Sequence, residues 1–334
     1  MEMAEKVRIA VYGYRDFDEA PFFTKFAEKY NVELLPIREA PGTANAHLAK
    51  GCAGVSIITH AVGEDILKIW AEMGVRHLST RTIGYDHIDL EAAKRCGITV
   101  SNVSYSTGSV ADYTVMLILM ALRKMKMIVR RSDAWDYGLP GNIGRELGPL
   151  TVGVIGTGKI GEHVIRNLSG FGCRILANDV YEKDSVKQYA EYVDRDTLFR
   201  ESDVITFHVP ALPDTEHIVN AETIKEMKDG VILINDARGA VIDTPALIEG
   251  LESGKIGGAA IDVVENELGI FYGDYKSQVI GHHELSILRD MPNVLFTPHM
   301  AFYTENAVSD MVEHSIQSIL LEAEGKVSPS RFKY

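Results

Sequence analysis

Three side chains with complementary chemistry stand shortly after apolar runs in the second half of the chain: Arg238, Glu267 and His299. An arginine can hold a carboxylate through two parallel hydrogen bonds, and a histidine that titrates near neutrality can move a proton. If the apolar runs are parallel strands, their carboxyl ends share the edge at which open α/β sheets bind ligands. The three side chains could therefore converge on one cleft that binds an acid and transfers a proton.

Each of these residues also has a structural interpretation. An arginine is more often part of a surface ion pair, although the glycine after an apolar strand favours a site for Arg238. Glu267 lies beside Glu265 and Asn266 in a turn typical of solvated acids. His208, at the end of another apolar run, is more typical of a hydrogen-bonded structural residue than of a catalyst. The sequence alone leaves both interpretations open.

The segment 156–161, GTGKIG, fits the dinucleotide-binding pattern G-x-G-x-x-G. It follows a strand-like run and opens a helix-like one, which is the setting that this pattern requires. Its glycines permit a tight turn, a close approach of the backbone to a pyrophosphate, and close packing of helix on strand. Asp179 ends the next strand at the spacing where an acid binds the ribose hydroxyls of NAD. The segment predicts an NAD site, with NADP as a weaker alternative because Asp179 would repel a 2′-phosphate.

Strand-like and helix-like segments alternate on both sides of this pattern. The first hundred residues form one complete α/β series, and residues 150–296 form a second. This alternation predicts parallel, doubly wound sheets. Between the two series, residues 109–129 have the pattern of one long helix that is apolar almost all round, which predicts burial against its own domain or a partner subunit. A final helix is predicted over residues 306–324.

Composition and charge argue against several classes of protein. The chain has 334 residues, enough for two domains, and its 34 Lys and Arg against 47 Asp and Glu give a net charge of −13, which repels a nucleic-acid backbone. The longest apolar run, 115–122, is short of the ~20 residues that a membrane span needs. The N-terminal sequence lacks the pattern of a signal peptide. Cys52, Cys96 and Cys173 are isolated and without metal-ligand spacing. We therefore expect a cytoplasmic protein with reduced thiols and no metal, which binds neither nucleic acid nor membrane.

Seven segments spread over nearly the whole chain occur in the order found in one family. They are STRTIGYDHID (79–89), YSTGSVADYT (105–114), the glycine pattern, HVPALPDTEHIV (208–219), NDARGAVIDTPAL (235–247), AAIDVVENELGIF (259–271) and TPHMAFYT (297–304). In these segments the chain resembles the D-isomer-specific 2-hydroxyacid dehydrogenases. Among them it is most similar to the D-lactate dehydrogenases and their relative in vancomycin-resistance operons.

The resemblance implies an α/β fold of two doubly wound parallel-sheet domains, with a Rossmann-type NAD domain inserted into a flavodoxin-like substrate domain. Residues 1–103 and 303–334 would form the substrate domain, and residues 104–302 the NAD domain. This arrangement accounts for a dinucleotide pattern that begins near the middle of the chain. Residues 105–130 would be a dimerisation helix, so we expect a homodimer.

The resemblance also implies the roles of the site residues. His299 would be the general acid–base, Glu267 its carboxylate partner, and Arg238 the anchor for the carboxylate and carbonyl of a 2-keto acid. The residues expected to contact the substrate are Ile83, Gly84, Tyr105, Phe302 and His60. Those expected to contact the cofactor are Gly156, Thr157, Gly158, Lys159, Ile160, Gly161, Asp179, Val209, Pro210, Thr215, Asp236, Ala237, Arg238 and Asp262. Asp236 departs from the family pattern, in which a small or neutral residue is expected near the nicotinamide.

The implied activity is the NADH-dependent, stereospecific and reversible reduction of pyruvate to D-lactate. Phe302 would close the pocket over the side chain of the substrate, and an aromatic wall fits the methyl group of pyruvate. Two alternatives remain: a dehydrogenase for larger 2-keto acids such as 2-ketoisocaproate or phenylpyruvate, and an NAD(H)-sensing protein similar to corepressors. A complete set of arginine, glutamate and histidine favours an enzyme over a sensor.

Overall fold

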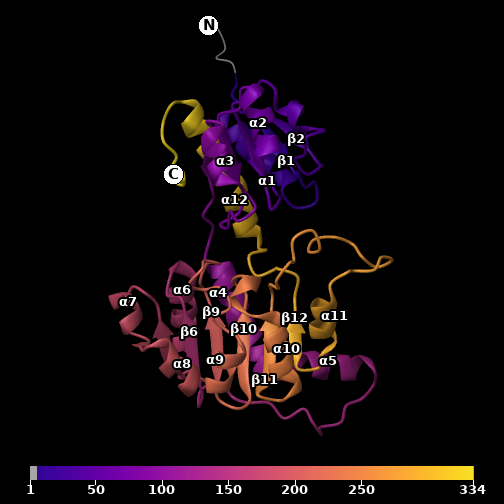
Figure 1. The fold of residues 1–334 in the computed structure, drawn as a ribbon, viewed down its shortest axis with the longest axis vertical. Helices are drawn as coiled ribbons and strands as arrows, with labels where there is room; N and C mark the ends of the chain where they lie inside the picture. The colour runs from indigo at the N-terminus through magenta and orange to yellow at the C-terminus, as the bar shows by residue number, and fades with distance from the viewer. Residues whose placement is uncertain (1–5, 334) are drawn as a thin grey trace. The chain divides into compact units, whose positions relative to one another are not determined.

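The computed structural model describes residues 6–333, which fold into two compact units (Figure 1). Unit 1 combines the residues up to Ser106 with those from Tyr303 on, and unit 2 is the continuous stretch Thr107–Phe302. The chain therefore begins in unit 1, builds unit 2 and returns to unit 1. The first boundary between the units lies between residues 106 and 107, three residues after the predicted boundary between 103 and 104.

Unit 1 contains a five-stranded parallel sheet in the order β2-β1-β3-β4-β5, which is the flavodoxin-like order. Its strands are β1 Arg8–Tyr12, β2 Glu33–Ile37, β3 Gly54–Ile57, β4 His77–Thr80 and β5 Thr99–Ser101. Its helices are α1 Ala20–Tyr30, the 3₁₀ helix η1 Ala46–Ala49, α2 Glu64–Glu72, α3 Leu90–Arg95 and α12 Glu305–Ala323.

The C-terminal helix α12 completes the hydrophobic core of unit 1. Ile319 of α12 is fully buried in one cluster with Phe23 of α1. Ser315 of α12 hydrogen-bonds Ser56 of β3 across 2.7 Å. A Cβ at Gly54 would lie 2.7 Å from the Ile319 side chain, so a glycine is needed for this close packing. The last helix of the chain is therefore part of the same core as the first strands.

Unit 2 contains a seven-stranded parallel sheet in the order β12-β11-β10-β9-β6-β7-β8. Counted from β6, this is the strand order of a Rossmann fold, with β12 added at one edge. Its strands are β6 Thr151–Ile155, β7 Arg174–Asn178, β8 Glu191–Tyr192, β9 Val204–Phe207, β10 Val231–Asn235, β11 Ile256–Ile261 and β12 Val294–Phe296. Its helices are α4 Gly108–Leu122, α5 Met125–Asp133, α6 Lys159–Ser169, α7 Asp184–Lys187, α8 Arg195–Glu201, α9 Ala221–Glu226, the 3₁₀ helix η2 Gly239–Val241, α10 Thr244–Glu252 and α11 His283–Asp290. The predicted α/β fold with two doubly wound parallel sheets is confirmed.

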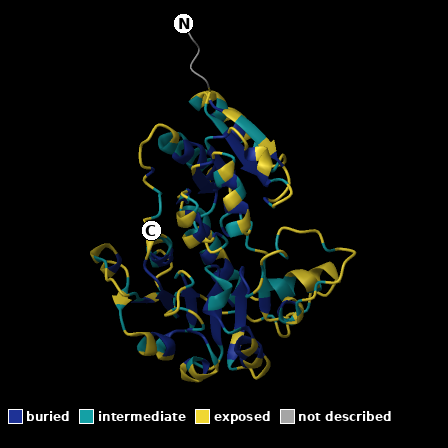
Figure 2. Cartoon of the chain, turned by 45° about the horizontal axis from the view of Figure 1, so that its top comes forward, coloured by how far each residue is buried: buried dark blue, intermediate teal, exposed yellow. Residues whose placement is uncertain are grey.

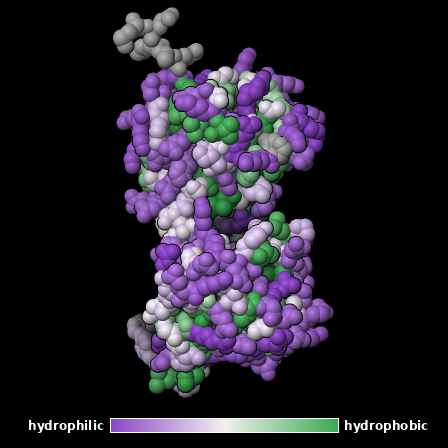
Figure 3. Space-filling model, turned by 90° about the vertical axis from the view of Figure 1, so that its left-hand side faces the viewer, coloured by the Kyte–Doolittle hydropathy of each residue, from purple (hydrophilic) through white to green (hydrophobic). Residues whose placement is uncertain are grey.

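Parallel strands that are covered on both faces have to be apolar along their length. β3, β9 and β10 are buried throughout, and Figure 2 shows buried strands inside both units with exposed residues on helices and loops. On the face shown in Figure 3, hydrophilic residues dominate and hydrophobic residues form small scattered groups. Within residues 6–333, no helix is long and apolar enough to cross a membrane.

The prediction of one continuous helix over residues 109–129 is wrong. The segment forms two helices, α4 Gly108–Leu122 and α5 Met125–Asp133, separated by Lys124 in a left-handed conformation with φ 52°. The break has tertiary causes: the Leu122 carbonyl accepts the Arg145 amide, and the Lys126 ammonium donates to the carbonyls of Arg289, Met291 and Val294. These contacts turn α5 away from the axis of α4.

The predicted burial of this helix, against its own domain or a partner subunit, is met in part within the single chain. The buried residues of α4 are Val110, Ala111, Thr114, Leu117, Ile118 and Leu122, and this helix contacts α6 and the strands β10, β11 and β12. Met116 is 38% exposed in the single chain, so part of the apolar surface of α4 remains accessible.

Candidate active site

The carboxyl ends of the strands in unit 2 carry most of the predicted functional residues. The turn after β6 holds the glycine pattern, and Asp179 follows β7. Arg238 follows β10, Asp262 and Glu267 follow β11, and His299 follows β12. Since all seven strands are parallel, these ends lie on one edge of the sheet, where Rossmann folds bind their ligands.

The glycine turn has the features that a pyrophosphate site needs. Gly156 has φ 92°, and a Cβ there would lie 2.5 Å from the His208 carbonyl oxygen. A Cβ at Gly161 would collide with the Gly156 carbonyl. At Gly158, by contrast, no atom of the described residues lies within 4 Å of an added Cβ, and no described side chain caps the first turn of α6. The open approach at Gly158 and the uncapped N-terminus of α6 fit the phosphates of NAD.

Asp179 lies beside this turn, as an NAD site requires. Its Oδ2 accepts the Thr157 amide at 2.6 Å, and its Oδ1 accepts the Tyr181 amide at 3.1 Å. The Asn178 side-chain amide donates to the Val193 carbonyl at 2.9 Å, so one of its two hydrogens is engaged by the backbone. The half-buried carboxylate of Asp179 is therefore fixed at the end of β7, where the ribose hydroxyls of a bound NAD would be expected.

Two further loops carry the other cofactor-binding candidates. Val209, Pro210 and Thr215 belong to the loop after β9, in which the Thr215 hydroxyl donates to the Pro210 carbonyl at 2.5 Å. In the turn after β10, the Ala237 amide donates to Asn235 Oδ1 at 3.2 Å. Sequence reasoning did not single out Asn235, whose buried side chain holds this turn in place.

His299 and Glu267 form a hydrogen-bonded pair. Nδ1 of His299 lies 2.6 Å from Oε1 of Glu267, and Oε2 of Glu267 accepts the Val264 amide at 2.8 Å. A carboxylate can only accept, so Nδ1 is the donor and Nε2 is left to exchange a proton with a substrate. His299 itself has φ 55°, an uncommon conformation for a residue with a side chain. The pair has the arrangement of a general acid–base with an orienting carboxylate.

Asp262 holds the backbone on which His299 stands. Its Oδ1 accepts the Thr297 hydroxyl at 2.6 Å and the Met300 amide at 2.8 Å, and its Oδ2 accepts the Ala301 amide at 2.9 Å. Its carbonyl accepts the His299 amide at 2.7 Å. Burial raises the pKa of the Asp262 carboxyl, and these donors oppose that rise.

Arg238 is positioned by the turn between β10 and η2. Asn235 Nδ2 donates to the Arg238 carbonyl at 2.9 Å, and Arg238 Nη1 donates to the Ala237 carbonyl at 2.7 Å. A Cβ at Gly239 would collide with the backbone of Val264, the residue whose amide binds Glu267. The glycine after Arg238 therefore lets the arginine turn pack against the segment that carries Glu267.

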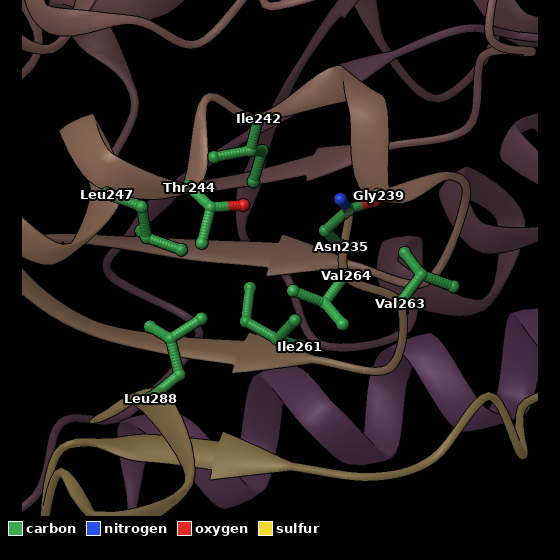
Figure 4. Close-up of a pocket in the computed structure, with 9 residues that line it drawn as sticks. All are labelled: Asn235, Gly239, Ile242, Thr244, Leu247, Ile261, Val263, Val264 and Leu288. Carbon is green, nitrogen blue, oxygen red and sulfur yellow. The ribbon is translucent and has the colours of Figure 1, made fainter. Parts of the chain in front are cut away.

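The small cavity in Figure 4 is not the candidate site. It lies between β10, β11, α10 and α11 and is lined mainly by aliphatic side chains, among them Ile242, Leu247, Ile261 and Leu288. None of its lining residues titrates near neutrality. We interpret it as a packing gap beneath the turn that carries Arg238.

Two aromatic residues of unit 2 lie next to His299. The Phe302 ring stands edge-on to the imidazole, with ring centroids 6.2 Å apart and an interplanar angle of 81°. The Tyr272 hydroxyl donates to the His299 carbonyl at 3.0 Å. Phe302 was a candidate from the sequence, whereas Tyr272 was not, because it lies in a long loop without a local signal for function.

The remaining substrate-binding candidates belong to unit 1. The Ile83 carbonyl accepts Asn102 Nδ2 at 2.8 Å, and the Gly84 carbonyl accepts the Thr82 hydroxyl at 2.6 Å. These bonds fix the loop after β4. Tyr105 is half-buried in the segment after β5. His60 is half-buried after β3, and burial, together with the charge of Arg81, lowers the pKa of its imidazole.

Comparison with known proteins identifies the family. Residues 115–301 match the model of the NAD-binding domain of D-isomer-specific 2-hydroxyacid dehydrogenases. The chain belongs to this family. It is 43% identical to an aromatic 2-oxoacid reductase of Clostridium sporogenes over 318 residues, which cover 94% of this chain and 95% of the relative. It is 44% identical to a D-specific alpha-keto acid dehydrogenase of Enterococcus faecium over 315 residues, 94% of this chain and 96% of that one.

A solved structure of a D-lactate dehydrogenase from Treponema pallidum superposes on this D-2-hydroxyacid dehydrogenase with a TM-score of 0.89, at 34% identity, covering 98% of this chain and all of the other. The predicted family, the oxidoreductase class and the NAD cofactor are thereby confirmed.

Proposed function

We propose that this D-2-hydroxyacid dehydrogenase reduces pyruvate to D-lactate with NADH, with His299, Glu267 and Arg238 as its catalytic residues. The observation that supports the chemistry is the 2.6 Å bond between His299 Nδ1 and Glu267. The observation that supports a small substrate is the Phe302 ring beside the imidazole, because an aromatic wall leaves room for a methyl group and crowds a larger one.

The proposed reaction follows from this arrangement. NADH, when bound, would supply the hydride for the keto carbon of the substrate. His299, oriented by Glu267, donates the proton of Nε2 to the keto oxygen as that oxygen becomes negative. Arg238 opposes the negative charge on the oxygen and binds the carboxylate of the substrate. We assign the backbone amides of Ile83 and Gly84, with Tyr105, to the same carboxylate.

A second candidate substrate is a larger 2-keto acid, above all an aromatic one. It is favoured by the 43% identity to the aromatic 2-oxoacid reductase of C. sporogenes over nearly the whole chain. An NAD(H)-sensing, corepressor-like role is less well supported, since a sensor has no need of the acid–base pair and the arginine turn. The cytoplasmic location remains a prediction that rests on the isolated cysteines.

Substrate size is tested by Phe302→Ala. We expect the unmodified enzyme to have its highest kcat/KM with pyruvate, and the variant to shift preference toward phenylpyruvate and 2-ketoisocaproate by roughly 10–200-fold, the range of one apolar contact. The measurement is a panel of 2-keto acids with NADH and chiral analysis of the products. Phe171→Ala, which truncates an exposed phenylalanine before β7, serves as a control without an expected effect. An unmodified enzyme that prefers phenylpyruvate would replace the pyruvate assignment by the second candidate.

Cofactor preference is tested at Asp179. We expect kcat/KM for NADH to exceed that for NADPH, because the carboxylate fixed beside Thr157 accepts ribose hydroxyls and repels a 2′-phosphate. Asp179→Ala should narrow this difference, whereas Asp184→Ala, at the exposed start of α7, should leave it unchanged. Equal kcat/KM values for the two cofactors in the unmodified enzyme would show that Asp179 does not control this choice.

The homodimer is tested by sedimentation. Met116 of α4 is 38% exposed, and the segment after α5 exposes Trp135, Leu139 and Ile143 by more than four fifths. Such apolar exposure is typical of a surface that a partner covers. We therefore expect a dimer at micromolar concentration and a weaker one after Leu139→Asp. A monomer at that concentration would contradict the proposal.

A further inference from the structure

Asp236 is a buried acid that the proposed reaction does not use. It follows β10 directly, and its side chain is 0% exposed. The parallel register pairs Asn235 with Ile261, so the next residues along the two strands, Asp236 and Asp262, stand side by side. Two carboxyl groups are therefore buried at neighbouring strand ends of one sheet.

The hydrogen bonds of Thr114 are compatible with a proton on Asp236. The Thr114 hydroxyl of α4 lies 2.8 Å from the Val110 carbonyl and 2.5 Å from Asp236 Oδ2. A hydroxyl has a single hydrogen, and a carbonyl can only accept. Both bonds form fully only if Thr114 donates to Val110 and a protonated Asp236 donates to the Thr114 oxygen. With Asp236 ionised, Thr114 would donate to the carboxylate, and the Val110 carbonyl would keep the Thr114 amide as its donor within α4.

The surroundings of the other carboxyl oxygen favour the protonated form of Asp236. Oδ1 of Asp236 is buried and has no hydrogen-bond partner among the described residues. His208 Nδ1 lies 3.8 Å from this oxygen, and burial lowers the pKa of His208 to about 3, so this ring is neutral. Asp262, in contrast, accepts three donors. Burial raises the pKa of Asp236 to about 7; the hydrogen bond from Thr114 opposes this rise, and the charge of Asp262 adds to it.

Asp236 lies on the half of the sheet that is expected to bind the nicotinamide nucleotide of NAD. Each half of a Rossmann sheet binds one mononucleotide, and the half with β6, β7 and β8 contains the glycine turn and Asp179. The other nucleotide is left to the ends of β9, β10 and β11, where Asp236 lies. Its nicotinamide ring is a cation in NAD⁺ and neutral in NADH. A buried carboxyl at this place experiences a full positive charge in one redox state only.

We propose that Asp236 is a residue by which the enzyme distinguishes the two redox states of its cofactor: its carboxyl keeps a proton beside NADH and releases that proton to solvent when NAD⁺ binds. The carboxylate so formed offsets the cationic ring, and no bond other than the O–H bond of Asp236 is broken. The inference rests on the NAD site described above and does not depend on which 2-keto acid is reduced.

Other titratable groups face Asp236 and have to be separated from it. They are Tyr113 on α4, His208 after β9, Asp262 after β11 and His299 after β12, and Arg238 follows two residues later on the same turn. Burial raises the pKa of Tyr113, so its hydroxyl stays neutral, and His208 stays neutral as described. Asp262 and His299 remain in a variant that changes only Asp236, so a comparison with that variant isolates the Asp236 proton.

The first experiment measures cofactor binding to the cofactor-free protein by calorimetry between pH 6 and 8, in buffers of different ionisation enthalpy. For the unmodified chain we expect NAD⁺ to bind with release of up to one proton and to tighten as the pH rises, by at most about tenfold per pH unit. NADH binding should lack this contribution. In Asp236→Asn, and in Asp236→Thr as a second variant, the number of protons released when NAD⁺ binds should be lower by up to one. Asp229→Asn, which removes an exposed acid paired with Lys255, should behave as the unmodified chain.

Two results would overturn the inference: proton release unchanged in the Asp236 variants, or the same release with NADH as with NAD⁺. A chain that binds neither cofactor would instead contradict the NAD site itself, so the two failures are distinguishable.

A second measurement needs no cofactor. An acid whose pKa is higher in the folded than in the unfolded chain lowers stability as the pH rises from about 4 to the folded pKa near 7, and not beyond it. The unfolding temperature of Asp236→Asn relative to the unmodified chain should therefore increase between pH 5 and 7 and then level off. A difference that stays constant across this range would show that Asp236 holds no proton.

Discussion

Replacing His299 with alanine is expected to lower kcat with pyruvate by at least about 10²-fold, the usual scale of general acid catalysis. The expectation follows from the bond between Nδ1 and Glu267, which leaves Nε2 as the atom that gives up a proton. Alanine has no proton to donate, so the keto oxygen would have to take its proton from water. NADH affinity should change little, because the glycine turn and Asp179, which we propose as contacts of the other end of the cofactor, are unchanged. Steady-state kinetics and a fluorescence titration with NADH measure the two quantities.

A matched histidine serves as the control for this variant. His283 is exposed at the first position of α11, and His283→Ala should leave kcat and the NADH dissociation constant unchanged. Near-normal turnover in His299→Ala would remove His299 from the acid–base role. An equal loss in His283→Ala would show that the assay reports on folding instead of proton transfer.

The strand ends could be predicted from the sequence because their signal is local. An apolar run that is bounded by a polar residue indicates where a buried parallel strand ends. Arg238, Glu267 and His299 stand just beyond such ends, and the structure confirms the strands β10, β11 and β12 that precede them. The bond between His299 and Glu267 joins residues 32 positions apart, and only the family resemblance pointed to it.

Features that depend on distant partners were not predicted. Nothing near Lys124 marks the end of α4, since the contacts that break the helix come from Arg145 and from the carbonyls that bind Lys126. The sequence placed Asp236 near the nicotinamide as a negative charge. What indicates a proton there is the burial of Asp236 beside Asp262, with one carboxyl oxygen unpartnered among the described residues. The local sequence pattern predicts which strand end carries a residue. The protonation state of that residue depends on how the rest of the unit packs around it.

Replacing Arg238 with lysine is expected to lower kcat/KM by about 10²-fold, the scale of losing one donor to the charge that develops in the transition state. Lysine keeps the positive charge but cannot offer two parallel N–H groups, so KM should rise and kcat should fall together. The backbone of the turn should survive, because Asn235 binds the main-chain carbonyl of residue 238 and not its side chain. NADH affinity, measured by the same titration as for His299→Ala, should therefore stay near that of the unmodified enzyme.

Arg174→Lys provides the matched control. Arg174 is half-exposed and pairs with Glu191 and Glu201 on the surface of unit 2, where such a change costs little. Its kinetics should equal those of the unmodified enzyme. If Arg238→Lys also leaves KM and kcat unchanged, Arg238 does not bind the substrate, and the proposed reaction loses the group that opposes the negative charge on the keto oxygen. If only KM rises, Arg238 binds the carboxylate in the ground state and in the transition state alike, and its proposed part in stabilising the transition state is wrong.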